Sequence, residues 1–263
     1  MNKETEGLEE AEREDTVVEE EEEEAERRET TGKRARERSL ENEEDNIFWV
    51  KIEGEKRLAT INLVPGNQVY REKLVKIDDE EFRAWDPYRS KLGAAIMNGL
   101  EILPIVRKSK VLYLGVSTGT TASHVSDIVG PNGIVFAVEH SSRVARDFLE
   151  RVASFRSNIV PILQDARSPK EYFSVYGPVD VVYVDIAQPD QTEIAILNCK
   201  TYLKKDGYIM LVIKTRSIDV TREPSQVMRS EVKKLSANFE IVQEINLEPY
   251  EGDHGMVIAK YLG

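Results

Sequence analysis

The chain has 263 residues, enough for one large domain or two small ones, and its formal net charge is −12. All of this net charge comes from residues 1–45, which hold 20 acidic and 8 basic side chains, whereas residues 46–263 carry 28 of each sign. Because there is no run of about 18 apolar residues and no apolar signal core near Met1, we expect a soluble cytoplasmic protein without a membrane span.

Residues 1–45 contain no aromatic side chain and include six consecutive glutamates at 19–24. Such a segment cannot bury enough apolar surface to offset the entropy of ordering. We therefore expect a disordered acidic tail at 1–45.

Residues 46–86 are rich in β-forming side chains, in short runs separated by polar pairs. The predicted strands lie at 47–52, 58–64, 68–70 and 74–77. No connection between them is long enough for a crossover helix, so we expect a small antiparallel β-rich domain over 46–86. Pro87 then begins a predicted helix over 88–102, and the second domain extends over 87–263.

Beyond residue 110, short apolar strands alternate with helices. Strands are predicted at 111–114, 134–138, 159–163, 179–184 and 208–213, with helices near 123–128, 143–155, 191–203 and 224–235. Two further strands, at 240–245 and 256–261, have no helix between them. This order predicts an α/β fold with a mostly parallel sheet, covered on both faces and antiparallel at one edge.

The turn after the first of these strands reads Leu-Gly115-Val-Ser117-Thr-Gly119-Thr120-Thr121. Glycines allow a backbone to approach a ligand closely, and the N–H groups at a helix start favour anionic atoms. Glu139 ends the next strand, 24 residues after Gly115, where an acidic residue can hold the hydroxyls of a ribose. Asp165 follows the third strand. Together these residues favour an adenosine-containing ligand at the carboxyl edge of the sheet.

The same turn also matches the G-x-S-x-G pattern of a hydrolase nucleophile, with Asp185 and His254 following in the hydrolase order. A nucleophile turn of that kind needs several strands of its sheet and an oxyanion-hole loop before it, whereas this turn follows the first strand of the alternating region and no His-Gly-Gly-type loop precedes it. The hydrolase interpretation is therefore the weaker one. One cysteine, Cys199, and three scattered histidines make disulfides and a metal site improbable, so we expect no metal.

Charged side chains stand at the ends of two otherwise apolar strands, Asp185 after one and Lys214 after the other. A buried structural ion pair would explain both. Lys91, and His254 in the turn between the last two strands, favour a functional site over a structural ion pair. Two lysines, an aspartate and a histidine can converge on one hydroxyl.

The strings that contain these residues resemble the fibrillarin family over residues 46–263. They are Leu-Gly115-Val-Ser-Thr-Gly-Thr-Thr-Ala-Ser-His, Asp185-Ile-Ala-Gln-Pro, Lys214-Thr-Arg-Ser-Ile-Asp-Val-Thr and Leu-Glu-Pro-Tyr-Glu-Gly-Asp-His254. The resemblance implies an S-adenosylmethionine-dependent ribose 2′-O-methyltransferase acting on rRNA or tRNA. It also implies a Rossmann-like, seven-stranded sheet preceded by a small β-rich part.

The resemblance also implies a cofactor site for S-adenosylmethionine. The turn and Gln188 would hold the methionine part, Glu139 the ribose, and Asp165 with the Ala166 backbone the adenine. Its full set comprises Gly115, Ser117, Gly119, Thr120, Thr121, Glu139, His140, Asp165, Ala166, Asp185 and Gln188. His140 is a departure, because the family usually carries an aromatic there; it can still stack on adenine, or it can be a spectator at a strand end.

Lys91, Asp185, Lys214 and His254 match the family's catalytic set around the target ribose. Methyl transfer to oxygen is an in-line displacement that needs the 2′-hydroxyl aligned and relieved of its proton. A lysine at its ordinary pKa of about 10.4 is a poor base. Lys214 would therefore need desolvation or nearby Lys91 to lower its pKa, or the lysines orient the hydroxyl while Asp185 places them.

The resemblance implies partners as well: a box C/D guide RNA paired to its rRNA or tRNA target, a Nop-domain scaffold protein and a kink-turn-binding ribosomal-type protein. The neutral body shows no basic stripe, which fits an enzyme whose partners hold the RNA. The acidic tail is a second departure from the family; it is either an inert solubilising segment, or an arm that competes with RNA or docks on a partner.

Two other classes share part of this pattern. A structural ribonucleoprotein subunit could bind the cofactor without turnover, but the four catalytic-type residues argue against it. A small-molecule methyltransferase would share the cofactor turn and the fold, but it would not be expected to carry this lysine pair with the Asp-Ile-Ala-Gln-Pro string.

Overall fold

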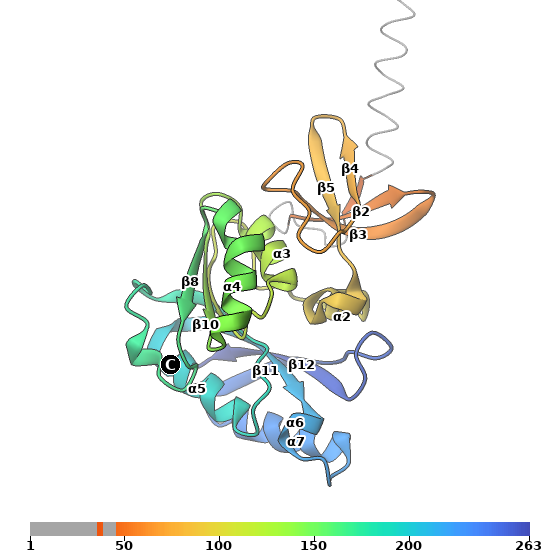
Figure 1. Cartoon of the computed structure of the whole chain (residues 1–263). Coiled ribbons are helices and arrows are strands. Elements are labelled where there is room, and N and C mark those ends of the chain that lie inside the picture. Colours follow the sequence, from red (N-terminus) through yellow and green to blue (C-terminus); the bar gives the residue numbers. More distant parts are fainter. Residues whose placement is uncertain (1–35, 39–45) are drawn as a thin grey trace, which may run out of the picture.

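The computed structural model describes residues 36–38 and 46–263. The predicted acidic tail therefore lies outside the described residues, except for Arg36–Arg38, which form strand β1 and pair with β2. Two sheets and the helices around them make up the described chain (Figure 1). No helix in the described residues has the length and apolar character that crossing a membrane requires.

The smaller sheet has five antiparallel strands in the order β1-β2-β3-β5-β4. The predicted β-rich region is thus present, but its strands differ in detail. Residues 68–70 form no strand, since the N–H groups of Val69 and Tyr70 donate to the carboxylate of Glu72 in a loop. A strand with three charged residues, β5, was not predicted. The bounds are β2 Ile47–Ile52, β3 Glu55–Ile61, β4 Leu74–Ile77 and β5 Glu80–Ala84.

The predicted helix over 88–102 is shorter in the structure. A 3-10 turn at Pro87–Arg89 is followed by α2, Lys91–Met97. Ser90 lies between them in an extended conformation, and its hydroxyl accepts from the N–H of Gly93 as an N-cap. The cap starts a new helix, and Gly99, at φ +88°, follows its end.

The larger sheet has seven strands in the order β11-β12-β10-β9-β6-β7-β8. Five neighbouring strands, β8, β7, β6, β9 and β10, are parallel. Strand β12 runs antiparallel to β10 and to the edge strand β11. This confirms the predicted α/β fold with an antiparallel edge. The bounds are β6 Lys110–Leu114, β7 Ile134–Glu139, β8 Ile159–Leu163, β9 Val179–Val184, β10 Leu203–Lys214, β11 Phe239–Asn246 and β12 His254–Tyr261.

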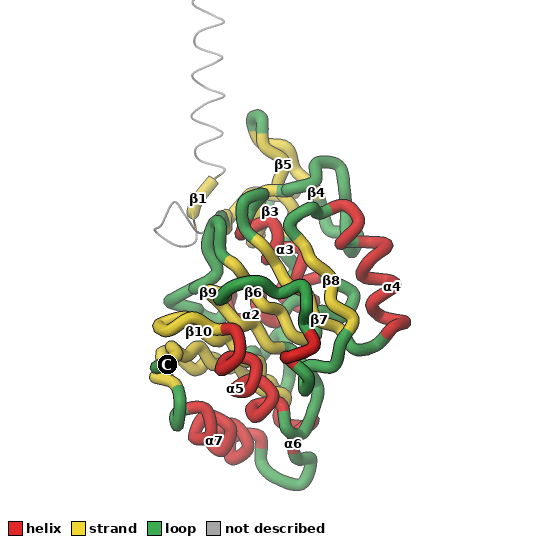
Figure 2. Tube along the Cα trace, turned by 90° about the vertical axis from the view of Figure 1, so that its left-hand side faces the viewer, coloured by secondary structure: helices red, strands yellow, loops and turns green. Residues whose placement is uncertain are grey.

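Alternate residues of the larger sheet serve two separate apolar cores. On β6, Val111 and Tyr113 pack on the side of α2, α3 and α4, while Leu112 and Leu114 pack on the side of α5 and α7. Figure 2 shows α5 and α7 together on one side, away from α4. Both faces are therefore covered, and the carboxyl ends of the strands carry the polar residues. The helices are α3 Thr120–Val129, α4 Ser142–Arg151, α5 Gln191–Tyr202, α6 Thr215–Ile218 and α7 Pro224–Leu235.

A buried ionic cluster joins the smaller sheet to α3. Arg83 of β5 lies 2.7 Å from Asp127 and 2.6 Å from Glu72, and Arg156 lies 2.6 Å from the other oxygen of Asp127. None of these four side chains is more than 1% exposed. Because each charge has an opposite charge in contact, the desolvated groups compensate one another. We call these four residues the inner cluster.

His124 of α3 lies next to the inner cluster and is completely buried. Its ring stacks on Trp85 at 4.5 Å, and its two nitrogens lie 2.8 Å from the Thr60 hydroxyl and 2.7 Å from the Tyr70 hydroxyl. Burial, and then the positive charges of Arg83 and Arg156, hold the pKa of His124 well below its usual range. This histidine is therefore a neutral part of the contact between the two sheets.

Candidate functional site

The glycine turn after β6 leads from the sheet into α3. Gly115, Ser117 and Gly119 all have positive φ, at +80°, +53° and +91°. The left-handed region is easily reached by glycine, but it is uncommon for a serine. The turn ends where α3 begins at Thr120, so the first N–H groups of this helix lie at the carboxyl edge of the sheet.

Gly115 also allows a close approach between two strand ends. A Cβ at this position would lie 2.7 Å from the carbonyl oxygen of Asp185 and 2.9 Å from the side chain of Ile186. Any other residue would separate the turn from the end of β9. Glycine therefore places the cofactor-type turn against Asp185.

Glu139, at the end of β7, is nearly buried. One carboxylate oxygen accepts from the N–H of Ser117 at 3.1 Å, and the other accepts from the N–H of Ser141 at 2.9 Å. The exposed His140 ring lies 3.3 Å from the same carboxylate. In the described chain, neither lysine nor arginine pairs with Glu139, so its remaining lone pairs can accept from ligand hydroxyls.

A cavity of about 250 Å³ lies at this edge of the sheet. The predicted cofactor residues that line it are Gly115, Ser117, Glu139, His140, Asp165, Ala166, Asp185 and Gln188, and Lys214 lines it too. Gly119, Thr120 and Thr121 do not line it. They form the helix start behind the turn, where a Cβ on Gly119 would lie 2.6 Å from the Phe148 ring of α4.

Arg167 was missed by the sequence reasoning. Its guanidinium donates to Gln188 at 2.8 Å and to Asp190 at 2.9 Å, and it lies 3.7 Å from Asp165. It thus bridges the loops that follow β8 and β9 at the mouth of the cavity. The only indication in the sequence was that Arg167 lies two residues after Asp165. Exposed arginines in loops are too common for this to have identified it as a site residue.

Asp185 lies between the two lysines that the sequence singled out. Its Oδ1 is 2.7 Å from Lys214 Nζ and its Oδ2 is 3.4 Å from Lys91 Nζ. Lys214 Nζ also donates to the Asp185 carbonyl at 2.9 Å. These three side chains are between 13% and 18% exposed, so they are largely buried but can still be reached from solvent. We call them, with Glu251 and His254, the outer cluster.

Glu251 completes the outer cluster, and the sequence reasoning had quoted this residue without giving it a role. Its carboxylate lies 3.8 Å from Lys91 Nζ and 3.3 Å from Nδ1 of His254. Burial, followed by the charge of Lys91, lowers the pKa of His254 below its usual value, although Glu251 acts the other way. A neutral imidazole therefore stands beside two lysines.

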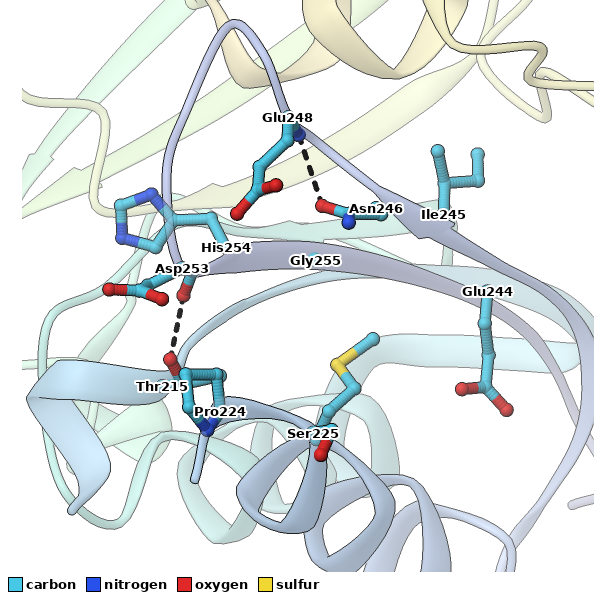
Figure 3. Close-up of a pocket in the computed structure, with 11 residues that line it drawn as sticks. Thr215, Pro224, Ser225, Glu244, Ile245, Asn246, Glu248, Asp253, His254 and Gly255 are labelled. Carbon is cyan, nitrogen blue, oxygen red and sulfur yellow. Dashed lines mark hydrogen bonds between the residues drawn. The ribbon is translucent and has the colours of Figure 1, made fainter. Parts of the chain in front are cut away.

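Two short hydrogen-bonded links hold the outer cluster in place. The Ser90 hydroxyl, which caps α2 just before Lys91, lies 2.9 Å from the hydroxyl of Thr121 in α3. On the other side, the Thr215 hydroxyl donates to the Asp253 carbonyl at 2.7 Å (Figure 3). His254 there also lines a second hollow of about 360 Å³, between the β11–β12 hairpin and the start of α7.

The geometry does not support a hydrolase. The backbone of Ser117 is bonded to Glu139, and His254 is bonded to Glu251 rather than to Ser117. Within the described residues, no group of three or more His, Cys, Asp and Glu side chains could hold a metal ion. The site thus offers a cavity with acceptors for an adenosine-type ligand, beside lysines that can donate hydrogen bonds to a hydroxyl.

Comparisons with known proteins show the family. The Fibrillarin family model matches residues 39–263. The fibrillarin-like rRNA/tRNA 2′-O-methyltransferase of Sulfurisphaera tokodaii is 54% identical over 221 residues, which is 83% of this chain and 94% of the relative.

Solved structures show the same fold. Aeropyrum pernix fibrillarin in complex with natively bound S-adenosyl-L-methionine is 45% identical, with a TM-score of 0.77 over 84% of this chain and 96% of the other. The fibrillarin of a fibrillarin/Nop5p complex is 37% identical, with a TM-score of 0.73 over 82% of this chain and 98% of the other.

Proposed function

This chain belongs to the fibrillarin family, and from that premise we propose that it transfers the methyl group of S-adenosylmethionine to ribose 2′-hydroxyls of rRNA and tRNA. The observation that carries this proposal is the outer cluster, in which Asp185 lies between two lysines directly against the Gly115 turn. A cofactor site and a hydroxyl site therefore share one wall.

We propose that S-adenosylmethionine lies in the 250 Å³ cavity. The donor set fits this group, because Glu139 keeps free lone pairs for two ribose hydroxyls and Asp165 can accept from an adenine amino group. Gln188 and the turn would hold the methionine part, the Ala166 backbone would meet the adenine, and His140 would stack on it. The bound cofactor supplies a methyl group made electrophilic by its sulfonium charge.

Two roles are open to the lysines. Charged Lys91 and Lys214 would donate hydrogen bonds to the 2′-oxygen and stabilise its developing negative charge, with Asp185 holding both in place. A neutral lysine would instead take the proton. His254 is neutral at neutral pH because burial and Lys91 lower its pKa, so it offers a second acceptor for that proton. The pH–rate profiles of the wild type, Lys214→Arg and His254→Asn distinguish these roles.

We further propose that a box C/D guide RNA selects the target nucleotide and that a Nop-domain scaffold and a kink-turn-binding protein bring this chain to it. The solved complex of a relative with Nop5p supports the scaffold. We also propose that the protein is cytoplasmic.

The test is transfer of labelled methyl groups from S-adenosylmethionine to a guide-paired RNA, with and without the two partner proteins. We expect one modified nucleotide, and only in the full assembly. Glu139→Gln should weaken cofactor binding measured by calorimetry, whereas Glu244→Gln, on β11 away from the cavity, should not. Cofactor binding without transfer in the full assembly would mean a structural subunit instead.

A further inference from the structure

Two hollows outside the cofactor cavity lie along the boundary between the smaller sheet and the methyltransferase domain. One, of about 570 Å³, extends from β3 past residues 70–73 and 84–89 to Tyr250. The other, of about 700 Å³, extends from residues 67–71 to Thr118, Thr120 and α4. Tyr70, Arg71 and Arg89 line both, so the two hollows adjoin each other. We call them together the boundary groove.

Basic side chains gather in the boundary groove although the sequence shows no basic stripe. The cations that line it are Lys56, Arg57, Arg71, Lys73, Arg89 and Arg151. Arg57 and Lys73 pair with glutamates at the surface, and Glu72 is turned inward to Arg83. Within residues 46–263 no carboxylate forms an ion pair with Arg71 or Arg89, and both are exposed. The six cations therefore outnumber the four carboxylates that line the groove, which are Glu55, Glu72, Asp86 and Glu150.

Aromatic rings alternate with these cations. Tyr88 is 63% exposed and rests edge-on against Tyr250, with ring centroids 4.9 Å apart. The Arg89 guanidinium lies over the Tyr70 ring at 5.1 Å. An exposed tyrosine ring is a platform on which a nucleobase can stack, and arginines beside it can reach phosphates.

Two stretches of chain that line the boundary groove continue directly into the outer cluster. Tyr88 and Arg89 come just before Ser90 and Lys91, and Tyr250 comes just before Glu251, whose carboxylate is 3.8 Å from Lys91 Nζ. An RNA strand whose ribose lies at Lys91 would therefore meet Tyr88 and Tyr250 next.

We propose that the boundary groove binds the strand of the target RNA beside the methylated nucleotide, with Tyr88 stacking on a base and Arg71 and Arg89 contacting phosphates. This inference rests on the proposed function, because it takes the outer cluster as the site of the target ribose. The exposed side chains that line the groove are mainly cations and aromatic rings rather than aliphatic groups, which favours a polyanion carrying bases over a protein partner.

The first test measures binding of the full chain to a fluorescein-labelled target RNA, alone and paired to guide, by anisotropy over a series of salt concentrations. Arg71→Glu and Arg89→Glu should each weaken binding by roughly tenfold or more and reduce the salt slope by about one. Tyr88→Ala should weaken it on the order of tenfold without changing the slope. Lys200→Glu on α5 and Phe173→Ala, whose ring is 91% exposed, are the matched controls and should bind as the wild type does.

The second test uses the full assembly, with 4-thiouridine next to the target nucleotide and crosslinks mapped by mass spectrometry. Crosslinks to peptides containing Tyr88 or Tyr250 are expected. Crosslinks elsewhere, or groove variants that bind RNA like the controls, would overturn the proposal. Loss of Nop-domain binding with RNA binding intact would also overturn it and assign the groove to a protein.

The two proposals fail in different ways. Groove variants should raise the KM for RNA and leave the Kd for S-adenosylmethionine unchanged, whereas failure of the proposed function would show as a wild type that binds RNA in the groove but transfers no methyl group. If the wild type methylates RNA and all three groove variants bind and methylate RNA as the wild type does, the groove proposal alone is refuted.

Discussion

The inner and outer clusters contain the same kinds of charged groups in opposite surroundings. In the inner cluster, Arg83 and Asp127 are 0% exposed and each has its charge matched. In the outer cluster, Lys91 is 18% exposed and sits 3.4 Å from Asp185, with a cavity alongside. Charged side chains that are fully buried can interact only with one another, whereas partly exposed ones can also bind a substrate. Similar ion pairs thus join the smaller sheet to α3 at one place and, under the proposed function, contact the target ribose at the other.

The largest expected effect comes from breaking the inner cluster. Arg83→Met would leave Glu72 and Asp127 buried without this partner, and we expect a loss of about 3–5 kcal/mol in the free energy of unfolding. Urea unfolding followed by circular dichroism measures it. Arg229→Met, an exposed change on α7, is the control and should leave the midpoint unchanged. A midpoint for Arg83→Met equal to that of the control would contradict the structural role of the cluster.

Breaking the outer cluster should affect turnover rather than stability. Lys214→Ala removes the ammonium that lies 2.7 Å from Asp185, and we expect methyl transfer to fall by about 100- to 1000-fold. Assembly with the partner proteins should persist, as checked by gel filtration. Lys233→Ala, exposed on α7, should transfer at the wild-type rate. Wild-type turnover in Lys214→Ala would remove this residue from the mechanism.

The pH dependence of stability sharpens the same comparison. Since the pKa of His124 is held well below 6.5 in the folded chain, the unfolded chain binds a proton there first as pH falls. The contribution of His124 is thus complete above pH 6.5 and is lost below it, by about 1.4 kcal/mol per pH unit. Urea unfolding of the wild type and His124→Gln over this range should show a shallower slope in the variant. Parallel slopes would mean that His124 is not kept neutral.

The smallest effect is expected at the link between Ser90 and Thr121. Ser90→Ala removes both the cap of α2 and the 2.9 Å contact with Thr121, and it should lower the free energy of unfolding by about 1 kcal/mol. Because Lys91 follows directly, turnover should fall severalfold as well. Ser90→Thr keeps the hydroxyl and should restore both measurements. If turnover is unchanged in Ser90→Ala, the cap does not position Lys91.

The sequence predicted the larger sheet well because its strands are short apolar runs that end in polar residues. Gly115, Glu139 and Asp185 follow such runs, so the strand order alone brings them to one edge. The family resemblance and the cavity agree on this edge. The kinked entry to α2 was missed because Ser90 interrupts a helical apolar pattern by its side-chain cap.

The inner cluster could not be predicted, because its residues are far apart in sequence and each looks like an ordinary surface charge. β5, which carries Arg83, has three charged residues among five and no apolar alternation, yet Phe82 and Arg83 are completely buried. Glu251 and Arg167 were missed for a related reason. Their roles depend on which loops meet at the sheet edge, and that is a property of the fold.

The most direct test of the account is a pair of guide-paired RNAs that differ only in the 2′-hydroxyl of the target nucleotide. In the full assembly with labelled S-adenosylmethionine, we predict transfer to the RNA with the hydroxyl and none to the RNA with 2′-deoxyribose at that position, with equal binding of both. Equal labelling of the two RNAs would contradict the account, because the methyl group would then be going to an atom other than the ribose 2′-oxygen.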